Sequence, residues 1–449
     1  MIEMPALTTK AQGSGPEADL SPNEIDSFFS ETLSKALAQT AGKGPVLILP
    51  PDITRFFSGA GFLTDIAVRE LNDRPCVIMP ALGTHMPMTD PELRRMFPQS
   101  SLKKSAGLFR VHDWRNDVAT LGRIEREWVN KASEGRVDYD WPVQVNKLLL
   151  EGGFSLIISV GQVVPHEVAG MANHTKNIFV GIGGKEAIDK SHFLGASYGM
   201  ERIMGKTDNP VRALFDEGFA RFSKSLPPVF FVQTVVSPRS DGTLATRGVF
   251  AGFDRECFEE AAALSREVNV NLLERPLYRT VVYLDPSEFR STWVGNKAIY
   301  RTRMAMSDGG ELLILAPGLE HFGEDKEVDK IIRKYGYRPS DEILDLVGRE
   351  QELAENLSVA AHLIHGSSEG RFTVRYCPGP GITREEIESV GYQWGDLEKE
   401  MKRYEIERLS LGWNRLGDGS WEGSATRFFY VPNPALGLWS ERERFINEK

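Results

Sequence analysis

Short apolar runs that alternate with helical patterns constrain the fold of this 449-residue chain more than any other feature. Residues 46–49, 156–160 and 229–236 have the length and apolar content of buried strands. Residues 62–71 and 211–222 carry apolar side chains at helical spacing. Further helices are predicted over residues 140–150 and 297–307. This alternation predicts an α/β fold, in which a mostly parallel sheet has helices on both faces.

The length of the chain favours two domains. We expect a disordered tail over residues 1–22, which are polar and contain Gly, Ser and Pro. An N-terminal domain should span residues 23–275, and a C-terminal α/β domain residues 276–425. Residues 426–449 should form a segment that packs back on the N-terminal domain. Each domain is expected to contain its own mostly parallel sheet, with the active site in the cleft between the domains.

Composition excludes several classes of function. The formal net charge of −10 argues against a nucleic-acid partner, since such proteins carry a basic stripe. No apolar run reaches the roughly 18 residues that a membrane span requires, and the N-terminus lacks the apolar core of a signal peptide. Cys76, Cys257 and Cys377 are odd in number and far apart, which predicts reduced thiols and a cytoplasmic setting. A small anionic substrate remains compatible with the charge, because a local group of Arg and Lys can override it.

Residues 162–192 follow a predicted strand and contain three of the eight histidines, His166, His174 and His192, together with Lys176. In α/β proteins ligands bind at the carboxyl ends of the strands. Neutral imidazoles there can accept protons or bind a transition metal, and a desolvated lysine can act as a nucleophile. The spacing matches no zinc motif, and each histidine taken alone can equally be structural.

Two other predicted strands also lead into polar side chains. Asp52 and Arg55 follow residues 46–49, and His85 follows a strand predicted at residues 77–80. Asp52 and Arg55 can equally form a loop ion pair. Arg55 suits a carboxylate ligand because its planar guanidinium can donate two parallel hydrogen bonds.

Together these motifs resemble those of the nickel-pincer lactate racemase family, over about residues 46–317. The 162–192 stretch is similar to the family signature at Pro165-His166, Ala169-Gly170, Lys176, Gly181-Ile182 and Ser191-His192. Three other segments resemble family motifs in the same order: residues 51–55 (Asp-x-Thr-Arg), residues 81–87 with Glu92 (Gly-x-His-x-Pro) and residues 111–114 (Asn-His-Asp).

The resemblance implies an isomerase, a racemase or epimerase that inverts C2 of a 2-hydroxy acid. Its cofactor would be a nickel-pincer nucleotide (a nickel pyridinium-3,5-bisthiocarboxylic acid mononucleotide), which dedicated biosynthesis enzymes supply. His192 would be the protein ligand of the nickel, Lys176 would form a covalent link to the cofactor, and Asp52 would hold the nucleotide. The N-terminal domain would therefore be the cofactor-binding domain.

The resemblance also implies that His85 and His166 are the acid/base pair and that Arg55 binds the substrate carboxylate. Removing C2 hydrogen as a proton is difficult, because the carbanion beside a carboxylate is poorly stabilised. Transfer of hydride to a pyridinium avoids this carbanion if a base takes the hydroxyl proton at the same time.

The sequence departs from the family pattern in two places. Where the family has approximately Tyr-Gln-x-x-Lys, this chain has Tyr300-Arg301-Thr302-Arg303-Met304, so the carboxylate-binding lysine is missing. Tyr300 is a candidate cofactor contact, and the replacement cation could be Lys297, Arg301 or Arg303. The substrate is therefore expected to differ from lactate. The second departure is residues 172–175, where Ser-Gly-Gly is replaced and His174 becomes an additional imidazole that could contact the cofactor.

Two other functions are compatible with the same residues. A divalent-metal hydrolase or lyase could use His85, His166 and His192 as its metal ligands. A non-catalytic protein that binds a nucleotide cofactor would explain the missing lysine at Met304.

Overall fold

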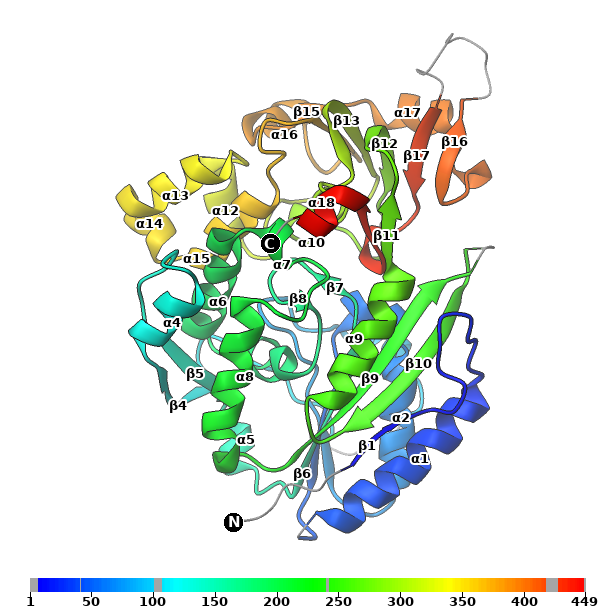
Figure 1. Ribbon diagram of the computed structural model, residues 1–449, viewed down its shortest axis with the longest axis vertical. Coiled ribbons are helices and arrows are strands. Elements are labelled where there is room, and N and C mark those ends of the chain that lie inside the picture. The colour runs from blue at the N-terminus through cyan, green and yellow to red at the C-terminus, as the bar shows by residue number, and fades with distance from the viewer. Residues whose placement is uncertain (1–6, 41, 101–106, 240–241, 417–426, 448–449) are drawn as a thin grey trace. The chain divides into compact units, whose positions relative to one another are not determined.

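A computed structural model describes residues 7–40, 42–100, 107–239, 242–416 and 427–447 of the chain (Figure 1). The chain divides into two compact units. The N-terminal unit consists of Met1–Leu194, Ile203–Arg239 and Leu244–Asn269. The C-terminal unit consists of Gly195–Arg202, Ser240–Thr243 and Val270–Lys449.

A six-stranded sheet with the order β1-β10-β9-β6-β2-β3 forms the centre of the N-terminal unit. Strands β9, β6, β2 and β3 run parallel to one another, whereas β10 pairs antiparallel with β9 and with the edge strand β1. The strand bounds are Thr8–Lys10 (β1), Val46–Leu49 (β2), Cys76–Ile78 (β3), Leu156–Gln162 (β6), Val229–Pro238 (β9) and Leu244–Gly252 (β10). Every residue of β2 and β6 is buried, as expected for central parallel strands.

Helices cover both faces of this sheet (Figure 1). The helices α1 (Pro22–Gln39) and α2 (Ala60–Glu70) bury one apolar face each in a core that includes Phe29, Ile66 and Ile158. Helix α1 begins in a capping box, because Ser21 and Glu24 satisfy each other's backbone N–H groups. Helix α9 (Glu256–Asn269) packs against β9 and β10.

The remaining elements that precede β9 belong to the N-terminal unit, apart from Gly195–Arg202, which holds the end of α6 and most of α7 and belongs to the C-terminal unit. They include two antiparallel pairs, β4–β5 and β7–β8. They are η1 (Ile53–Ser58), α3 (Asp90–Met96), β4 (Val118–Ile124), α4 (Arg126–Ala132), β5 (Trp141–Asn146), α5 (Leu148–Glu151), β7 (Pro165–His166), β8 (Gly170–Met171), η3 (Asn177–Gly181), α6 (Lys185–Tyr198), α7 (Met200–Ile203), α8 (Pro210–Phe222) and η4 (Ser223–Ser225).

The C-terminal unit contains a second six-stranded sheet, with the order β15-β14-β13-β12-β17-β16. All neighbours in it are parallel except β16 and β17. Its strands are β12 (Leu277–Tyr283), β13 (Met306–Ala316), β14 (Thr373–Pro378), β15 (Gln393–Trp394), β16 (Gly412–Arg415) and β17 (Arg427–Val431). Two further strands, β11 (Val270–Leu273) and β18 (Leu438–Glu441), form a separate parallel pair.

Eleven further helical segments lie among the described residues of the C-terminal unit. They are α10 (Thr292–Gly295), α11 (Lys297–Tyr300), α12 (Lys326–Tyr335), α13 (Ser340–Arg349), α14 (Gln351–Ala354), α15 (Leu357–His365), α16 (Arg384–Ser389), α17 (Leu397–Tyr404), η5 (Ile406–Arg408), η7 (Pro434–Leu436) and α18 (Arg442–Asn447). On one face of the sheet Tyr404 packs with Val281, Leu313 and Phe428. The predicted α/β class, with a mostly parallel sheet in each of two units, is confirmed.

Several expected boundaries need correction. Residues 7–22 are not a disordered tail, because Thr8–Lys10 pairs with β10 and Leu20 is buried; residues 1–6 lie outside the described residues. The units divide at Asn269 rather than at 275, since β11 pairs with β18. The same pairing places β18 in the C-terminal unit, and the expected packing of residues 426–449 on the N-terminal domain stays a prediction.

Two expected helices also differ in the structure: one region forms a strand, and the other helix is shorter than expected. Residues 141–146 form strand β5, because Trp141, Val143 and Val145 are buried as a hairpin with β4. The helix expected over residues 297–307 ends at Tyr300, and strand β13 already begins at Met306. Among the described residues, no helix is both long and apolar enough to cross a membrane.

Candidate functional site

The topology of the N-terminal sheet brings three polar loops together. From β2 the chain adds β3 on one side and β6 on the other, so the winding direction reverses at β2. Loops at such a switch point diverge and leave room for a ligand beyond the carboxyl ends of the strands. Asp52 and Arg55 follow β2, His85 follows β3, and His166 follows β6.

Asp52 and His85 form a hydrogen-bonded pair. Asp52 caps η1, and its Oδ1 accepts hydrogen bonds from the Thr54 backbone N–H (3.1 Å) and from the Thr54 hydroxyl (2.6 Å). Its Oδ2 lies 2.6 Å from His85 Nδ1. The Asp52 side chain is only 5% exposed, whereas that of His85 is 29% exposed. A carboxylate that orients an exposed imidazole is the usual arrangement of a general base and its positioning group.

His166 and Glu167 occupy the loop after β6. The backbone N–H of Val168 donates to His166 Nδ1 over 3.1 Å, within the tight β7–β8 hairpin. His166 Nε2 lies 3.7 Å from Glu167 Oε1. Both side chains are mostly buried, with exposed fractions of 8% and 16%.

Lys176 is partly buried among charged groups of the same loops. Burial, and then the positive charge of Arg55, lower the pKa of its ammonium to about 8, and Glu167 and Asp52 oppose this shift. At pH 7 roughly a tenth of Lys176 is therefore a neutral amine, the form that can attack an electrophile, against well under about 0.1% for an ordinary lysine.

His192 on helix α6 completes the group. Its Nδ1 lies 2.7 Å from the carbonyl oxygen of Ile188, which can only accept, so Nδ1 carries the proton. Nε2 therefore carries the lone pair. Burial and the nearby charge of Lys176 lower the pKa of His192 to about 4, which keeps the ring neutral at pH 7. Glu167 and His85 also act on this ring electrostatically, so the three loops and α6 converge on one region.

The backbone before Lys176 is strained. Asn173 and His174 both have positive φ values, of 70° and 58°, a region that non-glycine residues rarely adopt. A π-helical turn, η3, then begins at Asn177. Irregular backbone of both kinds concentrates at functional sites. These two left-handed positions fall within the residues that replace the family's Ser-Gly-Gly.

Arg212 of α8 holds this strained loop. Its fully buried guanidinium donates to the carbonyl oxygens of Met171 (2.5 Å) and Asn173 (3.2 Å) and to the hydroxyl of Thr175 (3.1 Å). The same guanidinium lies 4.4 Å from the centroid of the Phe258 ring. Sequence reasoning missed Arg212; the indication was an arginine on the apolar face of a predicted helix. Glu167 was also missed, because nothing but its position beside His166 distinguishes it.

His174, the expected additional cofactor contact, is part of the core. Its ring packs between Phe231 and Phe258, at centroid distances of 4.0 and 5.2 Å, and Nε2 lies 3.3 Å from the Asp254 carbonyl oxygen. Burial, and then Arg212, lower its pKa to about 3, so the ring is neutral. We therefore leave His174 out of the proposed site.

The packing of His174 predicts a stability effect. His174→Ala should lower the free energy of unfolding by about 2–4 kcal/mol, because it removes a ring held between two aromatic side chains. Denaturant unfolding of the cofactor-free chain measures this change. Unchanged stability combined with lost cofactor retention would instead assign His174 to cofactor binding.

The lowered pKa of Lys176 can be measured directly. Labelling with an amine-specific reagent, followed site by site with mass spectrometry, should give a midpoint of about 8 for Lys176, whereas ordinary lysines titrate near about 10.4. Arg55→Leu should raise the midpoint, since it removes a positive charge that opposes protonation. A wild-type midpoint near 10 would contradict the burial and charge argument.

The residues expected from the second domain are all buried within the C-terminal unit. Tyr300 is 3% exposed, with its ring near that of His365, and Lys297 lies 5.7 Å from the centroid of the Phe289 ring. Arg301 is fully buried, and its guanidinium lies near the carbonyl oxygen of Gly437 (3.5 Å). Met304 is also fully buried. The roles of Tyr300, Lys297 and Arg301 stay predictions.

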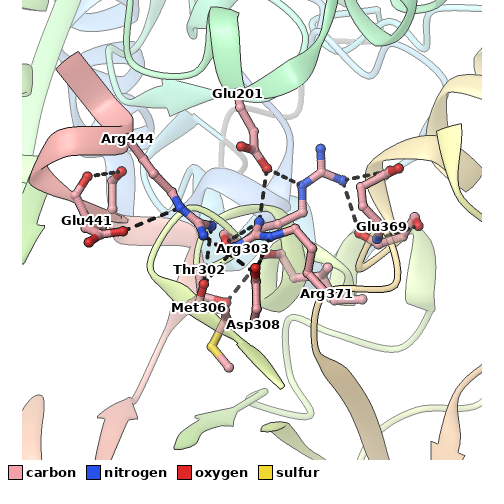
Figure 2. A network of polar contacts seen from close by, with 12 residues as sticks. Glu201, Thr302, Arg303, Met306, Asp308, Glu369, Arg371, Glu441 and Arg444 are labelled. Atoms are coloured by element: carbon pink, nitrogen blue, oxygen red, sulfur yellow. Dashed lines mark hydrogen bonds and ion pairs between the residues drawn. The ribbon is translucent and has the colours of Figure 1, made fainter. Parts of the chain in front are cut away.

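Arg303, another candidate for the missing cation, belongs to an ion-pair network within the C-terminal unit (Figure 2). It pairs with Glu201 (3.0 Å) and Glu369 (3.6 Å) and donates to the carbonyl oxygen of Ser367. Figure 2 shows Arg371 beside it, which also reaches Glu201 (3.7 Å). Arg303 is thus neutralised and buried, which argues against its binding a substrate carboxylate.

Comparison with known proteins gives one family match. Residues 23–202 match the family model described as lactate racemase N-terminal domain. In its N-terminal domain the chain is a homologue of the lactate racemase family. That match contains the whole group from Asp52 to His192. No curated protein sequence matches the chain.

Two solved structures share the fold. A protein from Thermotoga maritima superposes with a TM-score of 0.76 at 22% identity, covering 94% of this chain and all of that one. The lactate racemase apoprotein from Thermoanaerobacterium thermosaccharolyticum superposes with a TM-score of 0.65 at 17% identity, covering 92% of this chain and 93% of that one. At these identities the likeness establishes the fold.

Proposed function

We propose that this protein is a racemase-type isomerase that inverts C2 of a 2-hydroxy acid by proton-coupled hydride transfer. The observation that carries the proposal is the Asp52–His85 pair on a lactate racemase N-terminal domain, where a buried carboxylate orients a partly exposed imidazole. Such a pair can take the proton of a substrate hydroxyl. His166, on the neighbouring loop, is the second imidazole of the proposed pair.

The residues fit a nickel-pincer nucleotide in the chemistry of their donors. The His192 ring is neutral, and its Nε2 carries a lone pair. The hydrogen bond from Nδ1 to the Ile188 carbonyl oxygen fixes the orientation of the ring, as is usual for a histidine that binds a metal. Lys176 offers an amine with a lowered pKa for the covalent link. When bound, this cofactor supplies an acceptor for the hydride of C2.

Arg55 is the proposed ligand of the substrate carboxylate. It lies on the η1 segment that Asp52 caps, so the carboxylate ligand and the group that orients the base His85 belong to one turn. Asp52 in turn serves His85 directly, which is a different role from the nucleotide contact that the resemblance implied. With the lysine at Met304 absent, we propose a 2-hydroxy acid other than lactate.

The alternative of an ordinary divalent-metal hydrolase is less well supported. A metal ligand must present a bare nitrogen, yet the Val168 N–H faces His166 Nδ1, so the neutral ring carries its proton on Nε2. His166 would thus have to rearrange before it could join His85 and His192 around one ion.

The test is to produce the protein together with enzymes that build the pincer cofactor. We expect retained nickel, an added mass on Lys176, and interconversion of the enantiomers of at least one 2-hydroxy acid in a panel of chain lengths. A nickel-loaded protein that turns over none of them would contradict the proposed activity and favour a non-catalytic binding role.

A further inference from the structure

Helix α8 and the turn before it hold the segment that leads to Lys176. Asn209 caps α8, and its side-chain NH₂ group donates to the carbonyl oxygen of Ala169 over 3.3 Å. The next residue, Gly170, has a φ of 76°, and an added Cβ there would collide with the Lys206 carbonyl oxygen. The segment thus lies close against the start of α8 from its first residues.

Thr175, the residue before Lys176, is held by two side chains that lie one turn apart on α8. Its hydroxyl donates to Asp216 Oδ1 over 2.7 Å and accepts from Arg212 Nη1 over 3.1 Å. Arg255 pairs with the other oxygen of Asp216, so this carboxylate is fixed in turn. The hydroxyl therefore has a fixed acceptor and a fixed donor on the same helix.

The backbone between these anchors would not keep its shape alone. Asn173 and His174 are consecutive left-handed residues without being glycine, a conformation that is unfavourable for each of them. Arg212 offsets this strain, because its guanidinium also binds the carbonyl oxygens of Met171 and Asn173. One side chain therefore fixes both ends and the middle of residues 171–175. A planar guanidinium is suited to this task because it holds several donors in a rigid fork.

We propose that Arg212 is the positioning residue for Lys176: its guanidinium keeps the left-handed loop closed, and the closed loop holds the Lys176 amine at the candidate site. Lys176 follows Thr175 directly, so a shift of that residue moves the amine with it. In this role Arg212 acts through the loop and touches neither substrate nor cofactor. The task of the amine, attachment of the cofactor, rests on the proposed function, whereas its placement rests on the contacts of Arg212.

Two variants separate this role from an effect of charge. A nearby cation lowers the pKa of an ammonium, and Arg212 acts on Lys176 in this way too. Arg212→Lys keeps the positive charge, but an ammonium on a flexible stem does not reproduce the rigid planar fork. Thr175→Val is the milder change, because it leaves Arg212 in place and removes only the hydroxyl.

The first test uses the cofactor-free chain. Trace labelling with acetic anhydride, read site by site with mass spectrometry, gives the pH midpoint at which the Lys176 amine loses its proton. Burial is the largest cause of the lowered pKa of Lys176, so a loop that opens should expose the amine and raise the midpoint from about 8. We expect a rise of at least about one pH unit in Arg212→Lys, towards the ordinary value of about 10.4, and a smaller rise in Thr175→Val. A midpoint in Arg212→Lys equal to that of the wild type would overturn the proposal.

Arg74→Lys is the matched control. Arg74 likewise binds two carbonyl oxygens and a hydroxyl, but at the amino ends of β2 and β6, those of Gly42, Gly44 and Ser155. The candidate site lies at the carboxyl ends of these strands, so the Lys176 midpoint should equal that of the wild type. A rise as large as in Arg212→Lys would mean that general loosening, not loss of the loop contacts, exposes the amine. Thermal unfolding establishes that each labelled chain is folded. If Arg212→Lys does not fold, Thr175→Val against Arg74→Lys decides.

The second test uses chains produced beside the cofactor-building enzymes. Mass spectrometry gives the share of chains with added mass on Lys176, and metal analysis gives nickel. We expect this share to fall roughly 10–100-fold in Arg212→Lys, since a misplacement of about 1 Å can cost about 10²-fold in rate. It should not change in Arg74→Lys.

The outcomes distinguish the role of Arg212 from the proposed function. An unchanged share of modified Lys176 in folded Arg212→Lys would overturn the positioning role and leave the proposed racemase intact. A wild-type chain that acquires neither the added mass nor nickel would count against the proposed function. In that case the labelling midpoints would still decide whether Arg212 positions the amine.

Discussion

His192→Ala is expected to leave the protein without nickel when it is produced beside the cofactor-building enzymes. His192 Nδ1 donates its proton to the Ile188 carbonyl oxygen, so Nε2 carries the lone pair that can coordinate a metal. Loss of a partner that merely orients a ligand costs roughly 10–100-fold in metal affinity, so loss of the ligand itself should cost more than about 100-fold. Metal analysis of the purified chain measures nickel per protein.

The matched control is His85→Ala. His85 forms a hydrogen bond with Asp52 and is the proposed base, not the proposed nickel ligand. This variant should therefore retain the nickel content of the wild type and lose turnover. Retention of nickel by His192→Ala, or its loss from His85→Ala, would show that the two histidines have been given the wrong roles.

Asp52→Asn should lower turnover by about 10²–10⁴-fold with nickel unchanged. Both donors of Thr54 face Oδ1, so the amide oxygen of asparagine should remain there and its NH₂ group should face His85. An NH₂ group can only donate, which forces the proton of His85 from Nδ1 to Nε2 and removes the base. The structure changes little, because the side chains have the same shape.

Steady-state kinetics should show this effect mainly in kcat, since Arg55, the proposed ligand of the substrate carboxylate, is untouched. Asp113→Asn is the control for a general effect of removing a carboxylate; Asp113 contacts the neighbouring Arg115 and Asn116 backbone. A normal turnover number for Asp52→Asn would mean that another group, not Asp52, sets the tautomer of His85.

The sequence alone determined the α/β class and most of the candidate site. Buried parallel strands such as β6 need continuous apolar residues, and the loops that follow them stand out as polar, Gly-containing interruptions. That contrast is local, so Asp52, His85, His166, Lys176 and His192 could all be selected before any coordinates were known.

Tertiary structure decided which partner each of these residues has. Asp52 is 33 residues from His85, and the two meet only because β2 and β3 are parallel neighbours. Arg212 holds the loop before Lys176 from a helix 37 residues further along. Such long-range pairs leave no periodicity in the sequence, since they depend on how the sheet is wound.

The errors have the same origin. Residues 141–146 have enough apolar residues for a helix, but a partner strand, β4, was available to pair with them. His174 is a different case: it was expected to contact the cofactor because it lies where Ser-Gly-Gly is replaced, and this role stays a prediction, but two phenylalanines from β9 and α9 enclose its ring. Local sequence specifies which residues are polar and where strands end; the protonated nitrogen of each histidine is set by neighbours that only the folded chain supplies.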